Sequence, residues 1–259
     1  MLTTTQFLEC ELDNDLSEKI AFVTGGSAGI GAATVRMLAK AGSTVIVGYN
    51  KGESRATSLI DSLPGGGHST QQITMEDSAS IKRAADTIKN RHNKLHILVN
   101  SAGFTKPIPH NDLDALDDEF FDHMLLANVR GPFSVIRELR PLLQVGGDSV
   151  IVNLSSVSGF KGAGSNIAYC ACKAAIDTMT LSLARALGPE IRVNTVSPGA
   201  VATDFVAGRD RSKLEELAKL SPLQAVVEPE DVALAIMAYV THLKKSTGAQ
   251  MIVDSGRFL

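Results

Sequence analysis

The residues best suited to chemistry are a tyrosine and a lysine four positions apart. Tyr169 and Lys173 stand in the run Tyr-Cys-Ala-Cys-Lys. On a helix, residues four apart share one face, so the phenol and the ammonium would lie side by side. A phenol has a pKa near ~10, which a neighbouring cation lowers. Tyr169 is therefore a candidate acid or base for an alcohol–ketone couple, although this spacing alone often occurs by chance.

A glycine-rich run near the start of the chain indicates a second site, one that binds a ligand through the backbone. Residues 24–31 read Thr-Gly-Gly-Ser-Ala-Gly-Ile-Gly, with an apolar strand pattern before them and a helical pattern after them. Gly25 permits the turn, while Gly29 and Gly31 let the backbone approach a pyrophosphate and the helix pack closely. The helix N-terminus then faces the anion. This context predicts dinucleotide binding; the alternative is a glycine-rich turn without a ligand.

The elements that must position these residues alternate along the chain. Apolar, β-rich runs predict strands at 20–23, 44–47, 97–99, 150–152, 192–196 and 251–253, with a weaker one at 68–74. Helical patterns lie at 30–41, 78–89, 114–143, 165–187 and 229–240. Apolar strands of this kind imply a sheet covered on both faces. We expect a single doubly wound α/β (Rossmann) domain at 18–259, with a mostly parallel sheet of about seven strands, after an N-terminal extension at 1–17.

Composition narrows the functional classes. The 259 residues are 44% hydrophobic and 20% charged, with a net charge of −3 and no basic run, which does not favour nucleic acid or a membrane surface as a partner. No apolar stretch is expected to reach the ~20 residues of a membrane span. Cys10, Cys170 and Cys172 form no disulfide framework, and the histidines have no metal-ligand spacing. We expect a cytoplasmic protein without a metal site.

Five ordered elements extend over nearly the whole chain. They are the glycine-rich run, the Asn-Ser-Ala-Gly sequence at 100–103, Asn128, Ser156 thirteen residues before Tyr169, and the run at 194–199 followed by Thr203. Together they resemble the short-chain dehydrogenase/reductase family, including its 3-oxoacyl-(acyl-carrier-protein) reductases and carbonyl reductases. Two departures are Ser101 in place of an asparagine, and Gln72 or Thr74 where the third strand usually has an aspartate.

The resemblance implies hydride transfer between a ketone and a secondary alcohol, with the hydride carried by a nicotinamide cofactor. Ser156 would hydrogen-bond the substrate carbonyl, with Ser155 as the alternative serine. Tyr169 would supply or take the proton, and Lys173 would lower the tyrosine pKa and hold the nicotinamide ribose. Asn128 would fix a water that links Lys173 to solvent, or would merely cap or kink its helix.

The same resemblance places a larger set of residues at the cofactor: Gly25, Ser27, Ala28, Gly29, Ile30, Gly31, Tyr49, Asn50, Lys51, Asn100, Ala102, Gly103, Tyr169, Lys173, Pro198, Gly199, Val201 and Thr203. NAD enzymes bind the ribose 2′-hydroxyl with a carboxylate about 20 residues past the glycine turn, and Tyr49 stands near that position. Lys51 or Arg55 could pair with a 2′-phosphate, unless both are ordinary surface charges. Two residues count against a 2′-phosphate site: Glu53 lies close by, and Ala28 stands where many NADP-preferring relatives have arginine. We expect NADP(H), with NAD(H) possible.

The remaining expectations concern substrate and assembly. Residues 204–222 should form a mobile lid whose charges are mostly solvated. Apolar pocket walls are expected from Phe104, Ile108, Val157, Phe160, Val201 and Phe205, and no cationic cluster singles out an anionic substrate. The helices at 114–143 and 165–187 should pair in a homotetramer, or else a dimer. The expected function is an NADP(H)-dependent ketone–alcohol oxidoreductase; alternatives are an NAD-dependent alcohol or steroid dehydrogenase and a non-catalytic dinucleotide sensor.

Overall fold

A seven-stranded parallel sheet forms the centre of the molecule. The computed structural model describes residues 15–259. The strands run in the order β3-β2-β1-β4-β5-β6-β7, and every neighbouring pair is parallel. Their bounds are β1 Ile20–Thr24, β2 Thr44–Tyr49, β3 Ser69–Gln72, β4 Ile97–Asn100, β5 Ser149–Leu154, β6 Ile191–Pro198 and β7 Gln250–Val253. The predicted doubly wound fold is confirmed, including the weak third strand.

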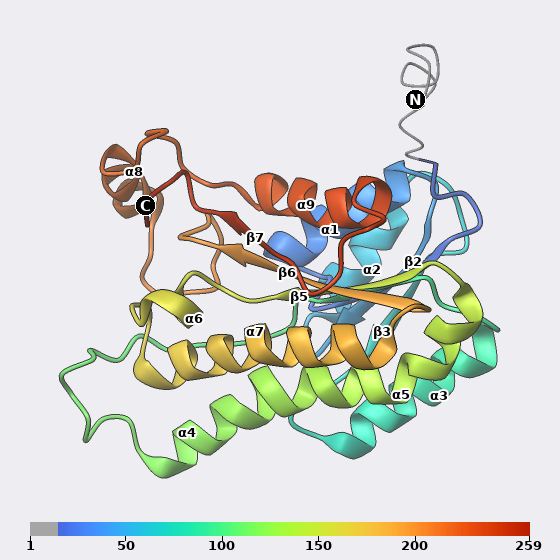
Figure 1. Cartoon of the computed structure of the whole chain (residues 1–259), viewed down its shortest axis with the longest axis horizontal. Helices are drawn as coiled ribbons and strands as arrows, with labels where there is room; N and C mark the ends of the chain where they lie inside the picture. The colour runs from blue at the N-terminus through green and yellow to red at the C-terminus, as the bar shows by residue number, and fades with distance from the viewer. Residues whose placement is uncertain (1–14) are drawn as a thin grey trace, which may run out of the picture.

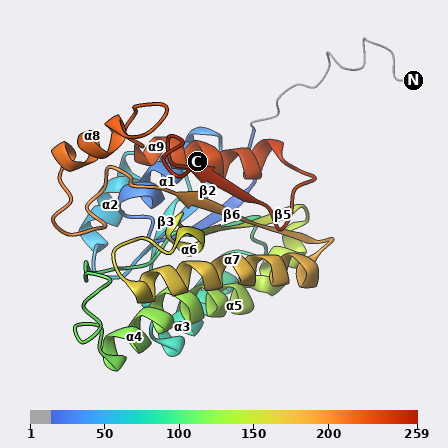
Figure 2. The same ribbon diagram turned by 60° about the vertical axis from the view of Figure 1, so that its left-hand side comes forward.

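Helices cover both faces of the sheet (Figure 1). Their bounds are α1 Gly29–Lys40, α2 Glu53–Asp61, α3 Ser78–Arg91, α4 Asp118–Leu125, α5 Gly131–Gly146, α6 Ser158–Lys161, α7 Ile167–Leu187, α8 Arg211–Lys219 and α9 Pro229–Met237. Alternation along each strand supplies the two apolar cores. In β1, Ala21 and Val23 join the core under α1, α2 and α9, while Phe22 joins the core under α3, α5 and α7. The view turned by 60° shows the same layers (Figure 2).

The helix predicted at 114–143 is wrong in its bounds and its continuity. It begins only at Asp118, after Asp117 caps it by accepting the Phe120 N–H at 2.8 Å. A π-helical segment, η2, occupies Leu126–Arg130 before α5 begins. The helix at 229–240 is likewise split, because α9 passes into a second π-helical segment, η3, at Ala238–His242. The helices α2, α6 and α8 are not predicted from the sequence, because α2 and α8 each bury only two apolar residues and α6 buries none.

The start of the described chain packs on the domain. Leu16 is buried, and its N–H donates to the Ala41 carbonyl at 2.7 Å. Residues 1–14, which include most of the expected extension and Cys10, lie outside the described residues. Contrary to the expectation that no stretch reaches the length of a membrane span, α7 has that length and composition, with 21 residues and a mean hydropathy of 1.2 in its most apolar window. Because 44% of that window is buried and one face of α7 packs on the protein, we interpret it as a core helix.

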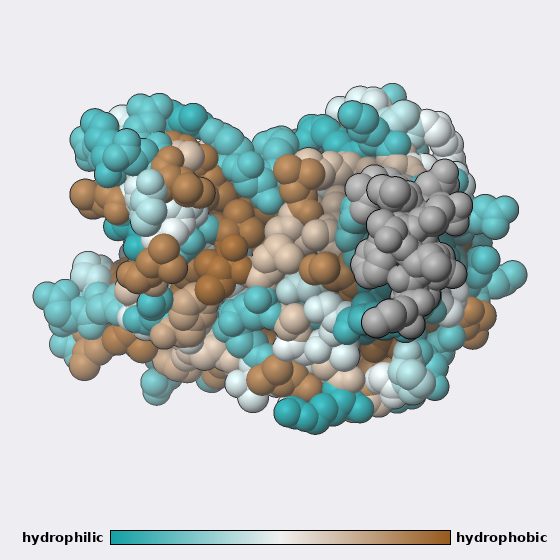
Figure 3. All heavy atoms as spheres, turned by 45° about the horizontal axis from the view of Figure 1, so that its top comes forward, coloured by the Kyte–Doolittle hydropathy of each residue, from teal (hydrophilic) through white to brown (hydrophobic). Residues whose placement is uncertain are grey.

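Helix α8 lies beside the C-terminal tail, although the two are far apart in the chain (Figures 1 and 2). The Arg257 guanidinium donates to the Leu217 carbonyl at 3.0 Å, near the C-terminal end of α8, where a cation is favourable. The Leu223 N–H donates to the Ser255 carbonyl at 3.2 Å. Hydrophobic atoms gather in the hollow on the left of the space-filling view (Figure 3). The tail that follows β7 is therefore hydrogen-bonded to α8 and to the segment after it.

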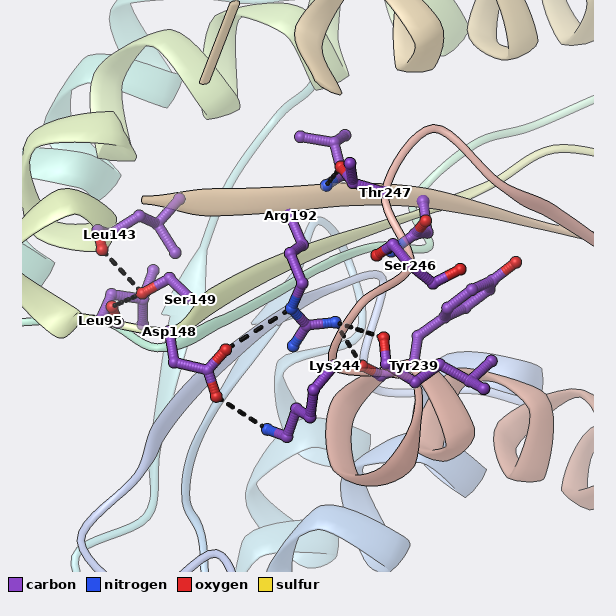
Figure 4. Close-up of polar contacts among 12 residues, drawn as sticks. Leu95, Leu143, Asp148, Ser149, Arg192, Tyr239, Lys244, Ser246 and Thr247 are labelled. Atoms are coloured by element: carbon purple, nitrogen blue, oxygen red, sulfur yellow. Dashed lines mark hydrogen bonds and ion pairs between the residues drawn. The ribbon is translucent and has the colours of Figure 1, made fainter. Parts of the chain in front are cut away.

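A charged clamp fixes the opposite end of the sheet (Figure 4). Buried Arg192, at the start of β6, donates to the carbonyls of Tyr239 at 2.8 Å and Leu243 at 3.2 Å. Its Nε lies 3.5 Å from Asp148, whose other carboxylate oxygen is 3.0 Å from the Lys244 ammonium. A guanidinium at the last carbonyls of α9–η3 also complements the helix dipole. The clamp joins the loop before β5 to β6 and to the end of this helix.

His96, just before β4, should make stability depend on pH. Its side chain is buried, and its Nδ1 accepts the Ile20 N–H at 3.0 Å, which requires an unprotonated Nδ1. Its pKa is lowered to about 4, mainly by burial and to a smaller extent by the charges of Lys19 and Lys94. Between pH 6.5 and about 4, the unfolded chain therefore binds a proton at His96 that the folded protein does not.

We therefore expect the free energy of unfolding to fall as the pH drops through this window. The part due to His96 is about 3 kcal/mol at its lower end. Urea unfolding at several pH values measures it: His96→Gln should lose this part of the slope, whereas His110→Gln, at a partly exposed histidine, should keep it. The same slope in His96→Gln as in the unmodified protein would contradict the assignment.

Candidate active site

A pocket of about 780 Å³ opens at the carboxyl ends of β1, β4, β5 and β6. The order of the strands reverses between β1 and β4, which is where open α/β sheets bind ligands. Its walls come from the glycine-rich loop, the ends of β5 and β6, the start of α7, the segment after β6 with α8, and the C-terminal tail. Elements that are distant in the sequence therefore meet in one cavity.

The glycine-rich loop forms a cradle for an anion at one end of the pocket. Helix α1 begins at Gly29 with Ala28 as its N-cap and no capping side chain, so its first N–H groups stay free for a ligand. A Cβ at Gly31 would lie 2.3 Å from the Gly25 carbonyl oxygen, and Gly25 itself has a φ of 64°. Only glycine satisfies both demands. The residues present therefore fit a dinucleotide pyrophosphate.

Three side chains with complementary chemistry lie in the same pocket. Ser156 follows β5, and its hydroxyl accepts the Ser158 N–H at 3.2 Å. Asn166 caps α7 by accepting the Tyr169 N–H at 2.7 Å, which fixes where the helix starts and where the phenol points. One turn later, the Lys173 ammonium donates to the Leu154 carbonyl at 2.6 Å and lies 5.5 Å from the centre of the tyrosine ring.

Burial dominates the electrostatics of this group. It raises the pKa of the Tyr169 phenol, against the lowering effects of the Ser156 hydroxyl and the charge of Arg209. Burial also lowers the pKa of the Lys173 ammonium to about 8, with Cys172 and Asp177 opposing it. At neutral pH the phenol is therefore protonated and the ammonium is still mostly charged.

Ser155 and Asn128 are both occupied by local contacts. The Ser155 hydroxyl donates to the Lys173 carbonyl at 3.1 Å and so ties β5 to α7. Asn128 lies in η2, where its amide nitrogen donates to the carbonyls of Met124 at 3.1 Å and Phe104 at 3.2 Å. Its amide oxygen accepts the Phe104 N–H at 3.1 Å. The side chain thus anchors the loop after β4 to the π-helical segment, a type of irregularity that is frequent near functional sites.

Comparison with known proteins gives matches over nearly the whole chain. A family profile described as "Enoyl-(Acyl carrier protein) reductase" matches residues 25–257. The granaticin polyketide synthase putative ketoacyl reductase 2 of Streptomyces violaceoruber is 34% identical, over 93% of this chain and 96% of that protein. The acetoacetyl-CoA reductase of Cupriavidus necator is 30% identical, over 93% and 98%. A short-chain dehydrogenase of Burkholderia cenocepacia, solved in complex with NADP, is 30% identical with a TM-score of 0.85, covering 94% of this chain and 99% of its own.

The chain belongs to the short-chain dehydrogenase/reductase family. This member of the family places thirteen of the residues expected from the sequence in the wall of one pocket: Gly25, Ala28, Gly29, Ile30, Ala102, Gly103, Ser156, Tyr169, Lys173, Pro198, Gly199, Val201 and Thr203. Gly31, Tyr49, Asn50, Lys51, Asn100 and Asn128 do not line it, and Ser27 lines a second, smaller pocket.

Asn100, the last residue of β4, lies behind the pocket wall of this dehydrogenase/reductase. The Asn100 amide donates to Asn153 at 2.9 Å, and Asn153 donates in turn to Thr180 at 2.9 Å, which links β4, β5 and α7. Ser101, one of the departures, donates its N–H to Thr24 at 3.2 Å. The turn below the pocket is therefore held by Thr24 and by this buried amide network, which the sequence analysis missed.

The second pocket lies between α1 and α2. Ser27, Arg36 and Arg55 are among its lining residues. The Arg55 guanidinium packs so closely on Gly52 that a Cβ there would lie 2.7 Å from Nη2. Tyr49, expected at the cofactor ribose, is instead buried, and burial together with Glu53 raises its pKa. Arg36 also lines this pocket, and the sequence analysis missed it because Arg36 and Arg55 share a pocket only in the folded protein.

The apolar walls of the pocket match the expectation only in part. Residues 204–222 contain the helix α8, and Phe205 lies against Tyr169 with ring centroids 6.0 Å apart. Val157, Val201 and Phe205 line the large pocket as expected, but Phe104, Ile108 and Phe160 do not. The lining residues instead include Val206, Arg209, Leu217, Arg257 and Phe258. The wall of this pocket therefore includes two arginines, Arg209 and Arg257, that the sequence did not predict there.

Proposed function

We propose that this short-chain dehydrogenase/reductase reduces a ketone to a secondary alcohol with NADPH, or catalyses the reverse reaction. One observation carries the proposal: Ser156, Tyr169 and Lys173 meet in the pocket that the glycine-rich loop closes at its other end. A proton donor, a carbonyl ligand and a dinucleotide cradle are the groups that this reaction requires.

The chain's own residues would act on the substrate oxygen. Bound NADPH supplies the hydride to the carbonyl carbon. Ser156 donates a hydrogen bond to the oxygen as negative charge develops there. Tyr169, whose raised pKa keeps it protonated, gives that oxygen its proton. The positive charge of Lys173 then stabilises the buried tyrosinate, which would otherwise be costly.

Asn128 is assigned a positioning role within this proposal. Its contacts with Phe104 and Met124 hold the π-helical segment and the loop after β4 in place. A water held at this segment, on a path from Lys173 to solvent, would return a proton to the tyrosine after each turnover.

NADP(H) is the proposed cofactor, with NAD(H) possible. The pocket between α1 and α2 brings the Ser27 loop together with two guanidinium groups, Arg36 and Arg55, at the end of β2 where the adenine ribose is expected. Guanidinium groups bind phosphate through paired hydrogen bonds. The structural relative from Burkholderia cenocepacia was solved with NADP. Lys51 is exposed and lies outside this pocket.

Replacing Arg55 with glutamine should reduce the preference for NADPH over NADH by about tenfold or more, since a hydrogen bond to a charged group contributes roughly 1.5–3 kcal/mol. Values of kcat/KM with each cofactor measure the preference. Lys51→Gln is the matched control, with an exposed charge two positions before α2. An equal loss with both cofactors, or a larger effect of Lys51→Gln, would place the phosphate elsewhere.

The reaction itself can be tested with a panel of ketones and secondary alcohols, followed by nicotinamide absorbance. Oxidation of NADPH by at least one ketone is the expected result. NADPH binding without turnover of any compound would favour the dinucleotide-sensing alternative. A higher kcat/KM with NADH would favour the NAD-dependent alcohol or steroid dehydrogenase.

We also propose a closed homotetramer, with a dimer as the smaller alternative. Five large apolar side chains are exposed on α4, α5 and α7, namely Leu125, Phe133, Val145, Ile167 and Leu181. Apolar side chains on adjacent helices mark a surface that a second copy can cover. Light scattering at micromolar concentration gives the mass that decides between these states.

A cytoplasmic setting is the last part of the proposal. Cys170 and Cys172 are free thiols buried in α7. They pack as small apolar side chains, and burial raises both their pKa values, which makes them unreactive. Structural thiols of this kind suit a reducing compartment.

A further inference from the structure

The lid contributes a cation to the substrate end of the large pocket. Arg209 is half-buried and lines the same cavity as Ser156 and Tyr169. Its charge acts on the tyrosine, and that of the tyrosine acts on it in return. The charged neighbour of Arg209 is thus the candidate proton donor at the reacting end of the pocket. Arg209 therefore faces the region that a substrate occupies beyond its carbonyl group.

The backbone around Arg209 explains why this side chain turns inward. Gly208 has a φ of 76°, a conformation that favours glycine, and the Arg209 N–H donates to the Val206 carbonyl at 3.2 Å. Asp210 then caps α8 by accepting the Lys213 N–H at 3.0 Å. Arg209 is thus held between a tight turn and a helix start, which fixes its position at the pocket.

Unlike Arg209, the neighbouring cations Arg211 and Lys213 form ion pairs or hydrogen bonds within the protein. Arg211 pairs with Glu228, at 2.5 Å, and with Glu215, at 3.2 Å. The Lys213 ammonium donates to the Gly208 carbonyl at 2.7 Å. In the part of the chain that the structure describes, the Arg209 guanidinium forms no hydrogen bond or ion pair of this kind. Its five donors remain available to a ligand.

The charged side chains that line the pocket around Arg209 are mostly positive. Arg257 also lines the pocket, although its guanidinium is partly committed to the Leu217 carbonyl. Among the described lining residues, the one carboxylate is Asp204, which is exposed. A partly buried guanidinium without a counter-ion is unfavourable until an anion reaches it. Such an anion would be held by charge-assisted hydrogen bonds in a paired geometry.

We propose that Arg209 binds an anionic group on the substrate. The natural substrate class is then a ketone, or the corresponding secondary alcohol, that carries a carboxylate. Arg257 adds positive potential at the same end of the pocket. This inference rests on the proposed function and extends it to the substrate class. It also makes the lid a determinant of specificity, because an anion bound to Arg209 ties the lid to the substrate.

The test uses oxo acids and their methyl esters, with two to five bonds between the carbonyl and carboxyl carbons. These pairs keep the carbon skeleton and remove the charge. With NADPH, the unmodified protein should have at least a tenfold higher kcat/KM for one or more acids than for the matched esters, as expected for a charge-assisted hydrogen bond. Arg209→Gln should reduce that ratio to near one, and Arg209→Lys should keep part of it. Arg211→Gln, which removes a paired lid cation, should leave the ratio unchanged.

Three results would overturn the inference. The esters could be preferred throughout the series, Arg209→Gln could lower acid and ester rates in equal proportion, or it could raise KM for NADPH without changing the ratio. The second result would mean that Arg209 acts on Tyr169 instead, and the third that it binds the cofactor.

Calorimetric binding of each acid and ester to the protein saturated with NADP separates this inference from the proposed function. Acid binding that depends on Arg209, without turnover of any compound, would support anion recognition and refute the reductase proposal. Turnover of neutral ketones, with no acid preference in either binding or kcat/KM, would do the reverse.

Discussion

Replacing Tyr169 with phenylalanine should lower kcat by at least ~10²-fold, the usual scale for loss of a general acid or base. The change removes one hydroxyl from a buried ring whose packing against Phe205 stays the same. Folding and cofactor binding should therefore persist. Steady-state kinetics with a reactive ketone measure kcat, and fluorescence titration with NADPH measures cofactor affinity.

A matched control distinguishes proton transfer from general loss of a buried phenol. Tyr239 is also a buried tyrosine, but it lies near the Arg192 clamp, remote from the pocket. Tyr239→Phe should leave kcat within a factor of about two. If Tyr169→Phe turned over at a near-normal rate, the tyrosine could not be the proton donor.

Replacing Lys173 with methionine should lower kcat by at least ~10²-fold and also weaken cofactor binding by about tenfold. The first effect follows because a buried tyrosinate loses its stabilising charge during proton transfer. The second follows because one charged hydrogen-bond donor to the nicotinamide ribose is removed. Methionine keeps a flexible apolar stem of similar length, so the packing of α7 on β5 should largely survive.

The pair of readouts separates the two residues. Tyr169→Phe should change kcat alone, whereas Lys173→Met should change both kcat and the Kd for NADPH. The exposed Lys161, on α6, provides the control, and Lys161→Met should change neither quantity. Thermal unfolding must accompany the measurement, since the Leu154 carbonyl loses its 2.6 Å donor. A Lys173→Met variant with normal kcat would refute its role in the reaction.

The fold could be predicted because its signals are local. Each central strand is a short apolar run, and a strand buried on both faces needs no partner to be visible in the sequence. The glycine-rich run was equally clear, because its backbone demands leave no other residue type at Gly25 and Gly31. That Tyr169 and Lys173 share one face of their helix followed from helix periodicity alone.

The helix ends and interruptions were less predictable. Nothing in the apolar pattern of residues 114–143 marks η2, which depends on contacts between Asn128 and the distant Phe104. The short helices α2 and α8 carry too few buried positions to show a period. Contacts between segments far apart in the chain decided these features, and local propensity does not contain that information.

The sequence by itself determined the sheet, the dinucleotide cradle and the identity of the candidate catalytic residues. Only the tertiary structure decided which charged residues accompany them. Arg36 of α1 and Arg55 of α2 line one pocket only because the fold brings their two helices to the same face of the sheet, and Arg209 enters the larger pocket because Gly208 turns the chain before α8. Motifs are properties of a few consecutive positions, whereas the direction of a side chain on a loop depends on turn geometry and on everything that packs around it.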